Sequence, residues 1–221
     1  MDQEPFAAVD AYITGKLLAD DPALANALAH NIARGLPEID VSPAQGKFLH
    51  LVARMIRARR ILEVGTLGGY STIWLASALP PDGQLTTLEL IPHHAATAAE
   101  NLAVAGLAAK VDIRTGPASD SLAELVAANV APYDLIFIDA DKPGNQAYFR
   151  QALRLSRTGT VIICDNVVRA GGVIDATSTD PSVLGTRALF DAIATTTNVS
   201  ATAIQTVGAK GWDGFALIVV D

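Results

Sequence analysis

The sequence contains a single cysteine, Cys164, and this scarcity excludes an intrachain disulfide and is typical of a reducing compartment. It also lacks any apolar run long enough to span a bilayer. Its first residues, Met1 to Glu4, are acidic and do not provide the basic and apolar segments of a signal peptide. We therefore expect a cytoplasmic protein that has no membrane partner.

Basic charge is sparse as well. Lysine and arginine number 16 against 23 acidic residues, which gives a net charge of −7. The densest basic stretch, Arg54 to Arg60, falls at the end of an otherwise apolar helix, so we expect no nucleic-acid partner. None of the four histidines has a second ligand at zinc spacing, and no Gly-x-Ser-x-Gly elbow is present. These two absences argue against a zinc site and against the usual α/β-hydrolase.

The sequence does show a regular alternation of short β-branched runs and helical stretches. The predicted strands are Ile61–Val64, Leu85–Leu90, Val111–Arg114, Leu135–Asp139 and Val161–Cys164. The predicted helices are Ala7–Leu18, Pro22–Arg34, Pro43–Ala58, Ser71–Leu79, His93–Val104, Ser119–Ala128, Asn145–Leu155 and Ser182–Thr195. Asp21 and Ser42 stand where N-caps are expected, each just before a proline. Strands that alternate with crossover helices predict a parallel sheet with helices on both faces.

The end of the chain breaks this alternation. Two predicted strands, Ala203–Val207 and Phe215–Val220, have no helix between them, and the connection Gly208–Gly214 is too short for a crossover. They must therefore be antiparallel neighbours. The expected fold class is α/β, a doubly wound, Rossmann-like sheet of seven strands that is mostly parallel and closes with an antiparallel hairpin. No linker or repeat divides residues 1–221, so we predict one domain, with N-terminal helices over 1–58 and a core over 59–221.

Acidic residues and glycines follow the predicted parallel strands at their carboxyl ends, which share one edge of the sheet. They are Glu63, Gly65, Glu89, Gly116, Asp139 to Lys142, Asp165 and Asn166. Open α/β sheets bind ligands at this edge, and so even a distribution is not expected of random surface loops. The sequence therefore predicts a ligand site there.

The first strand is followed by a glycine-rich turn, Glu63-Val-Gly-Thr-Leu-Gly-Gly-Tyr-Ser71, which allows the backbone to approach a ligand closely. A dinucleotide fingerprint would need glycine where Leu67 and Tyr70 stand, which argues against NAD. Glu89 ends the second strand, where a carboxylate can bind the hydroxyls of a ribose and leaves no place for a 2′-phosphate. Together these features favour nucleoside binding, although a strand-end acid that faces water is an equal interpretation of Glu89 alone.

A second group of polar residues follows the fourth and fifth predicted strands. Asp139, Asp165 and Asn166 offer oxygen ligands of the kind that Mg²⁺ prefers. Charges placed directly after a buried strand are costly unless they are paired or bound to metal, which favours a cation site over simple strand ends. Lys142 follows at once. Close to the metal ion and to a sulfonium cation, the neutral form of Lys142 would be favoured, and a neutral amine can act as a general base. The alternative is a surface lysine that pairs with Asp141.

These motifs resemble the cation-dependent O-methyltransferases of the caffeoyl-coenzyme A and catechol type. The resemblance runs from about Val41 to the C-terminus, and it is carried by the glycine-rich turn, Phe137-Ile-Asp-Ala-Asp-Lys142, Asp165-Asn-Val167 and Lys210-Gly-Trp-Asp-Gly-Phe215. The animal catechol enzymes have histidine and tryptophan where this chain has Ala140 and Asp141, which brings it nearer to the plant and microbial branch. Val167–Gly185, expected to help form the acceptor pocket, matches no known substrate signature.

The resemblance implies a set of site residues. Asp139, Asp165 and Asn166 would hold a divalent cation, most readily Mg²⁺, with Mn²⁺ or Ca²⁺ as alternatives. The residues expected to bind S-adenosylmethionine are Val41, Glu63, Gly65, Thr66, Ser71, Glu89, Ala118, Asp139 and Asp141. Within this set, either Asp139 or Asp141 would meet the cofactor's amino group. Lys142 and Asp139 would be the catalytic residues.

The expected function is cation-dependent methyl transfer from S-adenosylmethionine to an oxygen of a small aromatic vicinal diol of catechol, caffeoyl or flavonoid type. The resemblance also implies a homodimer in which residues 1–58 contribute to the substrate pocket. Two alternatives stay open at this point. One is a cation-independent small-molecule methyltransferase, and the other is a nicotinamide-dependent oxidoreductase.

Overall fold

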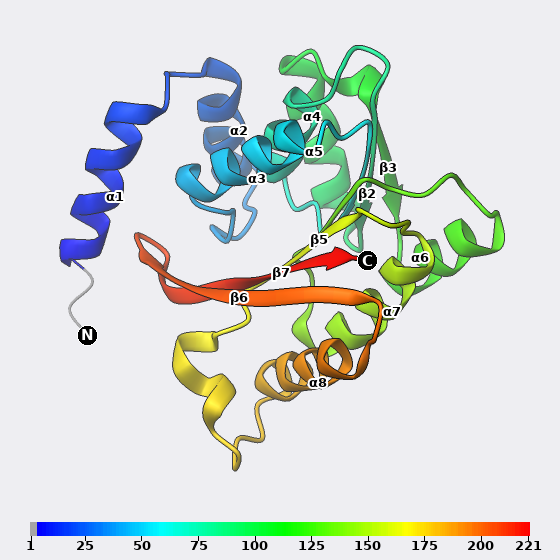
Figure 1. Cartoon of the computed structure of the whole chain (residues 1–221). Coiled ribbons are helices and arrows are strands. Elements are labelled where there is room, and N and C mark those ends of the chain that lie inside the picture. Colours follow the sequence, from blue (N-terminus) through cyan, green and yellow to red (C-terminus); the bar gives the residue numbers. More distant parts are fainter. Residues whose placement is uncertain (1–3) are drawn as a thin grey trace.

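The computed structural model describes residues 4–221, so Met1 to Gln3 of the acidic N-terminal segment lie outside the described residues. The chain forms a seven-stranded sheet with helices on both faces, as expected (Figure 1). Strand order is β3-β2-β1-β4-β5-β7-β6. The strands are β1 (Arg60–Val64), β2 (Gln84–Glu89), β3 (Val111–Thr115), β4 (Leu135–Ile138), β5 (Val161–Asp165), β6 (Val199–Gly208) and β7 (Gly211–Val220). Strands β1 to β5 pair in parallel, and β7 runs antiparallel to both β5 and β6.

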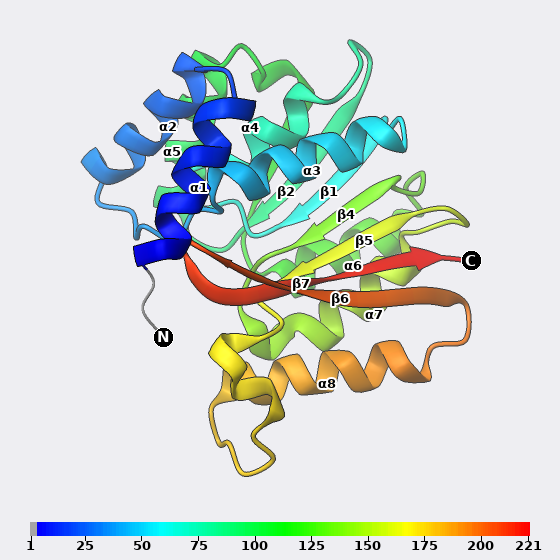
Figure 2. The same ribbon diagram turned by 60° about the vertical axis from the view of Figure 1, so that its left-hand side comes forward.

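The helices form two layers (Figure 2). Their bounds are α1 (Glu4–Leu17), α2 (Pro22–Ala33), α3 (Pro43–Met55), α4 (Tyr70–Ser77), α5 (Pro92–Val104), α6 (Ala118–Ala127), α7 (Asn145–Arg154) and α8 (Pro181–Thr195). Alternate strand residues face opposite layers, as the two-residue period of a strand requires. Ile61 belongs to the apolar core shared with α2 to α5, whereas Leu62 belongs to the core shared with α6, α7 and α8. Both faces of the central strands are therefore buried, which explains their continuous apolar runs.

Helices α2 and α3 begin at the predicted residues, Pro22 and Pro43. The Asp21 side chain accepts a hydrogen bond from the backbone N–H of Ala23, and Ser42 accepts one from Gln45, so both residues cap the helices that follow them. Helix α3 ends at Met55, three residues before the predicted end, because Arg57 adopts a positive φ of 54°. None of the helices over residues 4–221 is both long and apolar enough to cross a membrane.

The C-terminal hairpin is antiparallel, as predicted, but its arms are longer than predicted. Each arm has ten residues, and only Ala209 and Lys210 form the turn. Three glycines and many polar residues hide the strand pattern, since β6 lies at the edge of the sheet with most of its side chains exposed. The tip of this hairpin reaches α1, where Asp10 accepts a hydrogen bond from the N–H of Ala209. The N-terminal helices thus close over the carboxyl end of the sheet.

Candidate active site

The carboxyl ends of the parallel strands border a cavity of about 570 Å³. This volume falls within the range of small-molecule sites. Most of the residues expected to bind ligand line it: Val41, Gly65, Thr66, Ser71, Glu89, Ala118, Asp139, Asp141, Lys142 and Asn166. The structure therefore brings these residues together around one space.

The glycine-rich turn forms the floor of this larger cavity. Gly65 has a φ of 99°, and a Cβ there would lie 2.1 Å from the carbonyl oxygen of Asp139, so only glycine allows the two backbones to meet. The N–H groups of Thr66 and Leu67 both donate to Oε2 of Glu89, at 3.1 and 2.8 Å. These hydrogen bonds attach the turn to the end of β2, and the turn leaves room for a ligand to approach its backbone closely.

Glu63 was expected to line the cofactor cavity, but the structure places it beneath the cavity. Its side chain is fully buried and does not border the cavity. It accepts hydrogen bonds from the hydroxyls of Ser71 at 2.7 Å, Thr72 at 2.5 Å and Thr87 at 2.8 Å. Burial raises the pKa of Glu63 to about 7 against the opposing effect of these hydroxyls. Glu63 can therefore act on a ligand only through residues that line the cavity, namely Ser71 directly and Thr66 by way of Thr87.

Glu89 borders the larger cavity as expected, and it is almost fully buried. Besides the two turn N–H groups on Oε2, its Oε1 accepts a hydrogen bond from the N–H of Ile91 at 2.9 Å. Nδ1 of His94 lies 3.4 Å from the same oxygen. The side chain of His94 is 14% exposed and lines the cavity, although the sequence alone predicted no role for it. Its position in the first turn of α5, five residues after Glu89, was the signal available in the sequence.

Lys142 and Asp139 form a close ion pair at the junction of β4 and the next helical turn. Nζ of Lys142 donates to Oδ1 of Asp139 at 2.8 Å, and both side chains are largely shielded from solvent. The alternative in which a surface Lys142 pairs with Asp141 therefore does not hold. Asp141 instead accepts hydrogen bonds from the N–H of Gly144 and the hydroxyl of Tyr148. Burial and the neighbouring Asp141 carboxylate raise the pKa of Tyr148.

Asp165 lies at the end of β5, next to Asn166. Burial, together with the nearby Asp139 carboxylate, raises its pKa to about 7 against the lowering effect of Lys142. Two carboxylates that repel each other in a buried place, beside an amide oxygen, are suited to a hard divalent cation. Over residues 4–221, no three side chains of the histidine, cysteine or acidic type are placed together for a metal. The donor set that fits here is two carboxylates and one amide, which matches Mg²⁺ better than zinc.

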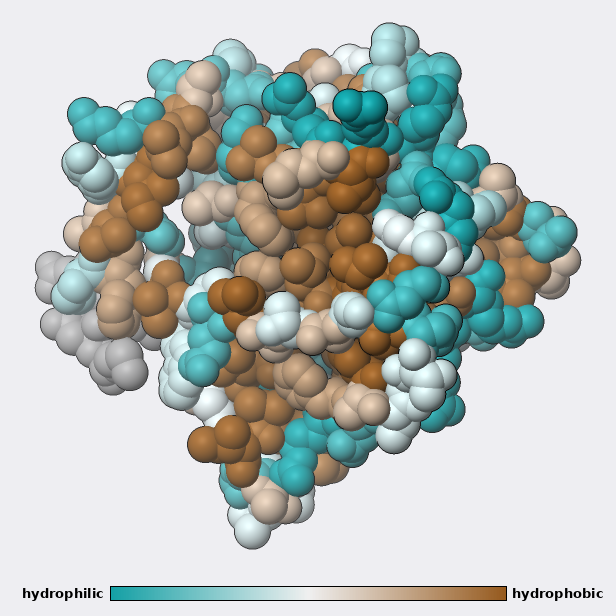
Figure 3. All heavy atoms as spheres, viewed as in Figure 1, coloured by the Kyte–Doolittle hydropathy of each residue, from teal (hydrophilic) through white to brown (hydrophobic). Residues whose placement is uncertain are grey.

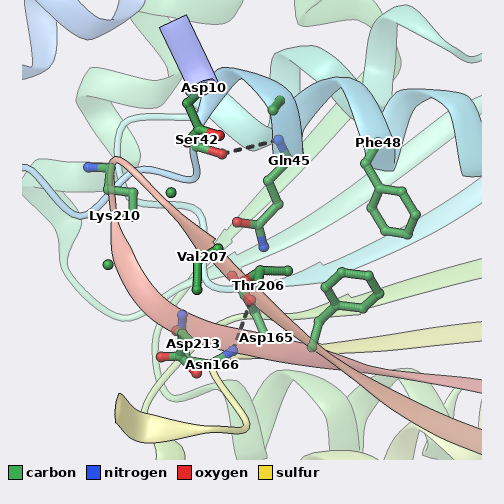
Figure 4. A pocket seen from close by; sticks show the side chains of 14 residues that line it. Asp10, Ser42, Gln45, Phe48, Asp165, Asn166, Thr206, Val207, Lys210 and Asp213 are labelled. Carbon is green, nitrogen blue, oxygen red and sulfur yellow. Dashed lines mark hydrogen bonds between the residues drawn. The ribbon is translucent and has the colours of Figure 1, made fainter. Parts of the chain in front are cut away.

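A second cavity, of about 320 Å³, adjoins the first (Figure 4). It lies between the N-terminal helices and the β6–β7 hairpin, and Asn166 borders both cavities. Asp165 borders only this smaller cavity. Its remaining walls come from α1, the start of α3 and the hairpin: Asp10, Ser42, Ala44, Gln45, Phe48, Thr206, Val207, Gly208, Lys210, Gly211, Asp213 and Phe215.

The stretch Val167–Gly185 contributes less to these cavities than we expected. From this stretch only Arg169 borders either cavity, and it borders the larger one. Part of the stretch forms a short 3₁₀ segment, Arg169–Ile174. It is held to the hairpin because Asp213 accepts hydrogen bonds from the N–H groups of Val168 and Arg169. No sequence pattern indicated that the hairpin would form a cavity wall instead.

The chain resembles known proteins in both sequence and structure. The family model described as O-methyltransferase matches residues 16–218. The sequence is 51% identical to a catechol O-methyltransferase of Niastella koreensis over the full length of both chains. The structure superposes on the Bacillus cereus O-methyltransferase in complex with S-adenosylhomocysteine with a TM-score of 0.98, 53% identity and full coverage of both chains. It also matches TomG of Streptomyces achromogenes, in complex with S-adenosylmethionine, with a TM-score of 0.96, 48% identity and coverage of 100% and 99%.

Proposed function

The chain belongs to the O-methyltransferase family and is an S-adenosylmethionine-dependent enzyme, and from this premise we propose that its acceptor is a small aromatic vicinal diol bound beside a divalent cation. The observation that carries the proposal is the meeting of the two cavities. Asp139 borders the larger cavity, Asp165 borders the smaller one, and Asn166 borders both. A cofactor in the larger cavity and an acceptor in the smaller one would therefore face each other across these three residues.

The cation would be held by Asp139, Asp165 and Asn166. Its role would be that of a Lewis acid that favours the phenolate form of the acceptor, whose hydroxyl has a pKa of about 10 in water. The raised pKa of Asp165, at about 7, supports this assignment because a divalent charge would relieve the repulsion between the two carboxylates. The ion pair of Lys142 with Asp139 leaves Asp165 without a cation of its own at hydrogen-bonding distance among residues 4–221.

Lys142 is the proposed proton acceptor. It lines the larger cavity beside Asp139, and its side chain is buried. In its neutral form Nζ would take the proton of the acceptor hydroxyl, while Asp139 holds the resulting ammonium in place. S-Adenosylmethionine, held by the residues that line the larger cavity, would supply an electrophilic methyl group to the acceptor oxygen. Holding donor and acceptor in line is worth roughly 7–11 kcal/mol in favourable systems.

The smaller cavity favours a compact acceptor. Phe48 and Phe215 lie with their rings 4.8 Å apart and offer an aromatic wall next to Asp165, which pairs with Phe215 across β5 and β7. Three aspartates and one lysine supply the charged groups of this cavity. A coenzyme A ester carries several phosphates, which such a lining would repel. A bare catechol therefore fits better than a caffeoyl-coenzyme A ester.

We also propose that two copies of the chain form a dimer through α1. The helix carries the exposed apolar side chains Val9, Tyr12, Ile13 and Leu17, and it has no fully buried residue among those described (Figure 3). A helix with so little burial gains stability when a second copy covers it. Light scattering coupled to size exclusion tests this directly, with a mass of twice 23.0 kDa as the expected result.

The decisive experiment is methyl transfer from labelled S-adenosylmethionine to a panel of diols, with Mg²⁺ and with EDTA. The panel contains caffeic acid, its coenzyme A ester, protocatechuic aldehyde and a flavonoid diol. We expect activity that EDTA removes, with the small catechols preferred over the coenzyme A ester. Activity that survives EDTA would instead support the cation-independent alternative. Cofactor binding without turnover of any diol would contradict the proposed acceptor class.

A further inference from the structure

The larger cavity is bordered by one carboxylate to which the family resemblance gives no role in cofactor binding. Asp40 lies in the connection between α2 and α3, directly before Val41, and both residues line the cavity. Asp40 is half-buried, and burial raises its pKa against the opposing effect of Lys210. A partly desolvated carboxylate that faces a ligand cavity needs a cationic partner.

The other carboxylates of this cavity are already engaged. Asp139 accepts from Lys142, and Asp141 accepts from Gly144 and Tyr148. Glu89 accepts from three backbone N–H groups. Asp40, by contrast, receives one hydrogen bond from another side chain in the described part of the chain, from Nδ2 of Asn31 to Oδ1 at 3.1 Å. The backbone N–H of Asp40 itself also interacts with the carboxylate, but a carboxylate can accept about four hydrogen bonds, so Asp40 keeps acceptor capacity for a ligand.

Asn31 holds Asp40 in place as part of a buried amide network. The carbonyl oxygen of Asn31 accepts a hydrogen bond from Nδ2 of Asn101 at 2.9 Å, and the same Nδ2 donates to the backbone carbonyl of Gly68 at 2.8 Å. A Cβ on Gly68 would lie 1.9 Å from Oδ1 of Asn31, so the glycine turn and Asn31 are in tight contact. The network therefore fixes Asp40 relative to the turn on which the cofactor rests.

Two neighbours place Asp40 at the methionine end of the cofactor rather than at the nucleoside end. The family resemblance implies that Glu63, Gly65, Thr66 and Ser71 line the methionine part of the cofactor and that Val41 contributes backbone contacts there, and Val41 follows Asp40 directly. The Asp40 charge also adds to the effect of burial in raising the pKa of Tyr70, the residue before Ser71. At this end the cofactor carries an α-ammonium group.

We propose that Asp40 is a further cofactor-binding residue, whose carboxylate accepts a hydrogen bond from the α-ammonium group of the methionine moiety. Asp40 would add to the contact that the resemblance gives to Asp139 or Asp141, and Asn31 acts as its positioning residue. The inference rests on the proposed function for the orientation of the cofactor. A charge-assisted hydrogen bond of this kind is about twice as strong as a neutral one.

The test is calorimetric binding of S-adenosylhomocysteine and of its desamino analogue, which lacks only the α-amino group. We expect Asp40→Asn to weaken S-adenosylhomocysteine on the order of tenfold and to leave the desamino analogue within about twofold. Asp40→Glu, which keeps the charge, should restore part of the preference for the amino compound. Glu124→Gln is the matched control, because it removes the same charge from an exposed side chain outside the cavity and should change neither affinity.

Equal weakening of both ligands by Asp40→Asn would overturn the proposal, since it would show that Asp40 only shapes the cavity wall. Unchanged binding of both ligands would overturn it as well. If Asp40→Asn does not fold, the same two ligands are compared on Asp40→Ser and on the wild type. Equal affinity of the wild type for the two ligands would then contradict the proposal. Failure of the wild type to bind S-adenosylhomocysteine at all would instead overturn the proposed function itself.

Discussion

Nζ of Lys142 lies 2.8 Å from Oδ1 of Asp139, and both residues of this ion pair border the larger cavity. Replacing Lys142 with Met removes the proposed proton acceptor and a positive charge beside the cation site. We expect kcat to fall by about 10²- to 10⁴-fold, with affinity for S-adenosylhomocysteine little changed and Mn²⁺ bound at least as tightly. Steady-state kinetics and metal titration check this. Lys110→Met, whose ammonium group contacts only the carbonyl of Leu79, is the control; a kcat for Lys142→Met near the wild-type value would contradict the assignment.

Asp165→Asn separates the cation from the cofactor. Asp165 borders the smaller cavity and not the larger one, so the change should abolish Mg²⁺-dependent turnover while S-adenosylhomocysteine still binds within about threefold of wild type. Calorimetric titration with Mn²⁺ and with S-adenosylhomocysteine measures the affinity for the cation and for the cofactor separately. Asp191→Asn, an exposed position on α8, provides the control. A variant that turns over at full rate without metal would disprove the cation scheme.

Gly65→Ala tests the close approach of the turn to β4. The substitution combines a positive φ with a Cβ only 2.1 Å from a backbone oxygen, so it should destabilise the fold and prevent cofactor binding. Gly159→Ala shares the positive φ, at 87°, but its Cβ would enter open space. We expect the control to lower the free energy of unfolding by about 1–2 kcal/mol and Gly65→Ala to lower it by clearly more. Urea unfolding of both variants measures these changes. Equal losses in the free energy of unfolding would show that the positive φ alone, and not the contact with the backbone of Asp139, causes the effect.

Phe48→Leu tests the aromatic wall of the smaller cavity. Leucine keeps most of the apolar volume but removes the ring that lies 4.8 Å from Phe215. The KM for the diol should rise severalfold because the aromatic contact is worth about 0.5–1.5 kcal/mol, whereas the dissociation constant of S-adenosylhomocysteine should stay the same. Phe190→Leu, a half-buried position packed against the opposite core, is the matched control. An unchanged KM would place the acceptor elsewhere.

The sequence predicted the parallel sheet well because its strands are buried on both faces and end in acids or glycines. Residues such as Gly65 and Asp139 could be placed at one edge from topology alone. The same reasoning could not separate a residue that lines a cavity from one beneath it. Glu63 and Ser71 belong to the same turn, yet only Ser71 reaches the larger cavity.

Contacts between distant parts of the chain were not predictable from spacing. The smaller cavity depends on α1 meeting the hairpin tip, as in the hydrogen bond between Asp10 and Ala209, which are 199 residues apart in the sequence. Asp40 likewise gains its place from Asn31 and Asn101, whose amides form a network across two helices. No local pattern marks such pairs, because their partners are set by packing of complete elements.

Glu63 makes the stability of the protein depend on pH. Its pKa is about 7 in the folded chain and 4.5 in the absence of structure. Between these values the unfolded chain releases the proton that the folded chain keeps, so the unfolded state binds fewer protons and the free energy of unfolding falls as pH rises. The fall is complete above about pH 7 and amounts to about 3 kcal/mol at this degree of burial.

Glu63→Gln should remove this part of the pH dependence, since an amide does not titrate. Its NH₂ group adds a constant change in stability, so the informative quantity is the slope between pH 4.5 and 7 and not the offset. Asp165, whose pKa is raised in the same direction, remains in the variant and leaves a residual slope. Urea unfolding in EDTA at several pH values measures both proteins. Slopes that coincide would mean that Glu63 is already ionised in the folded state, and that the hydroxyls of Ser71, Thr72 and Thr87 stabilise its charge more than burial opposes it.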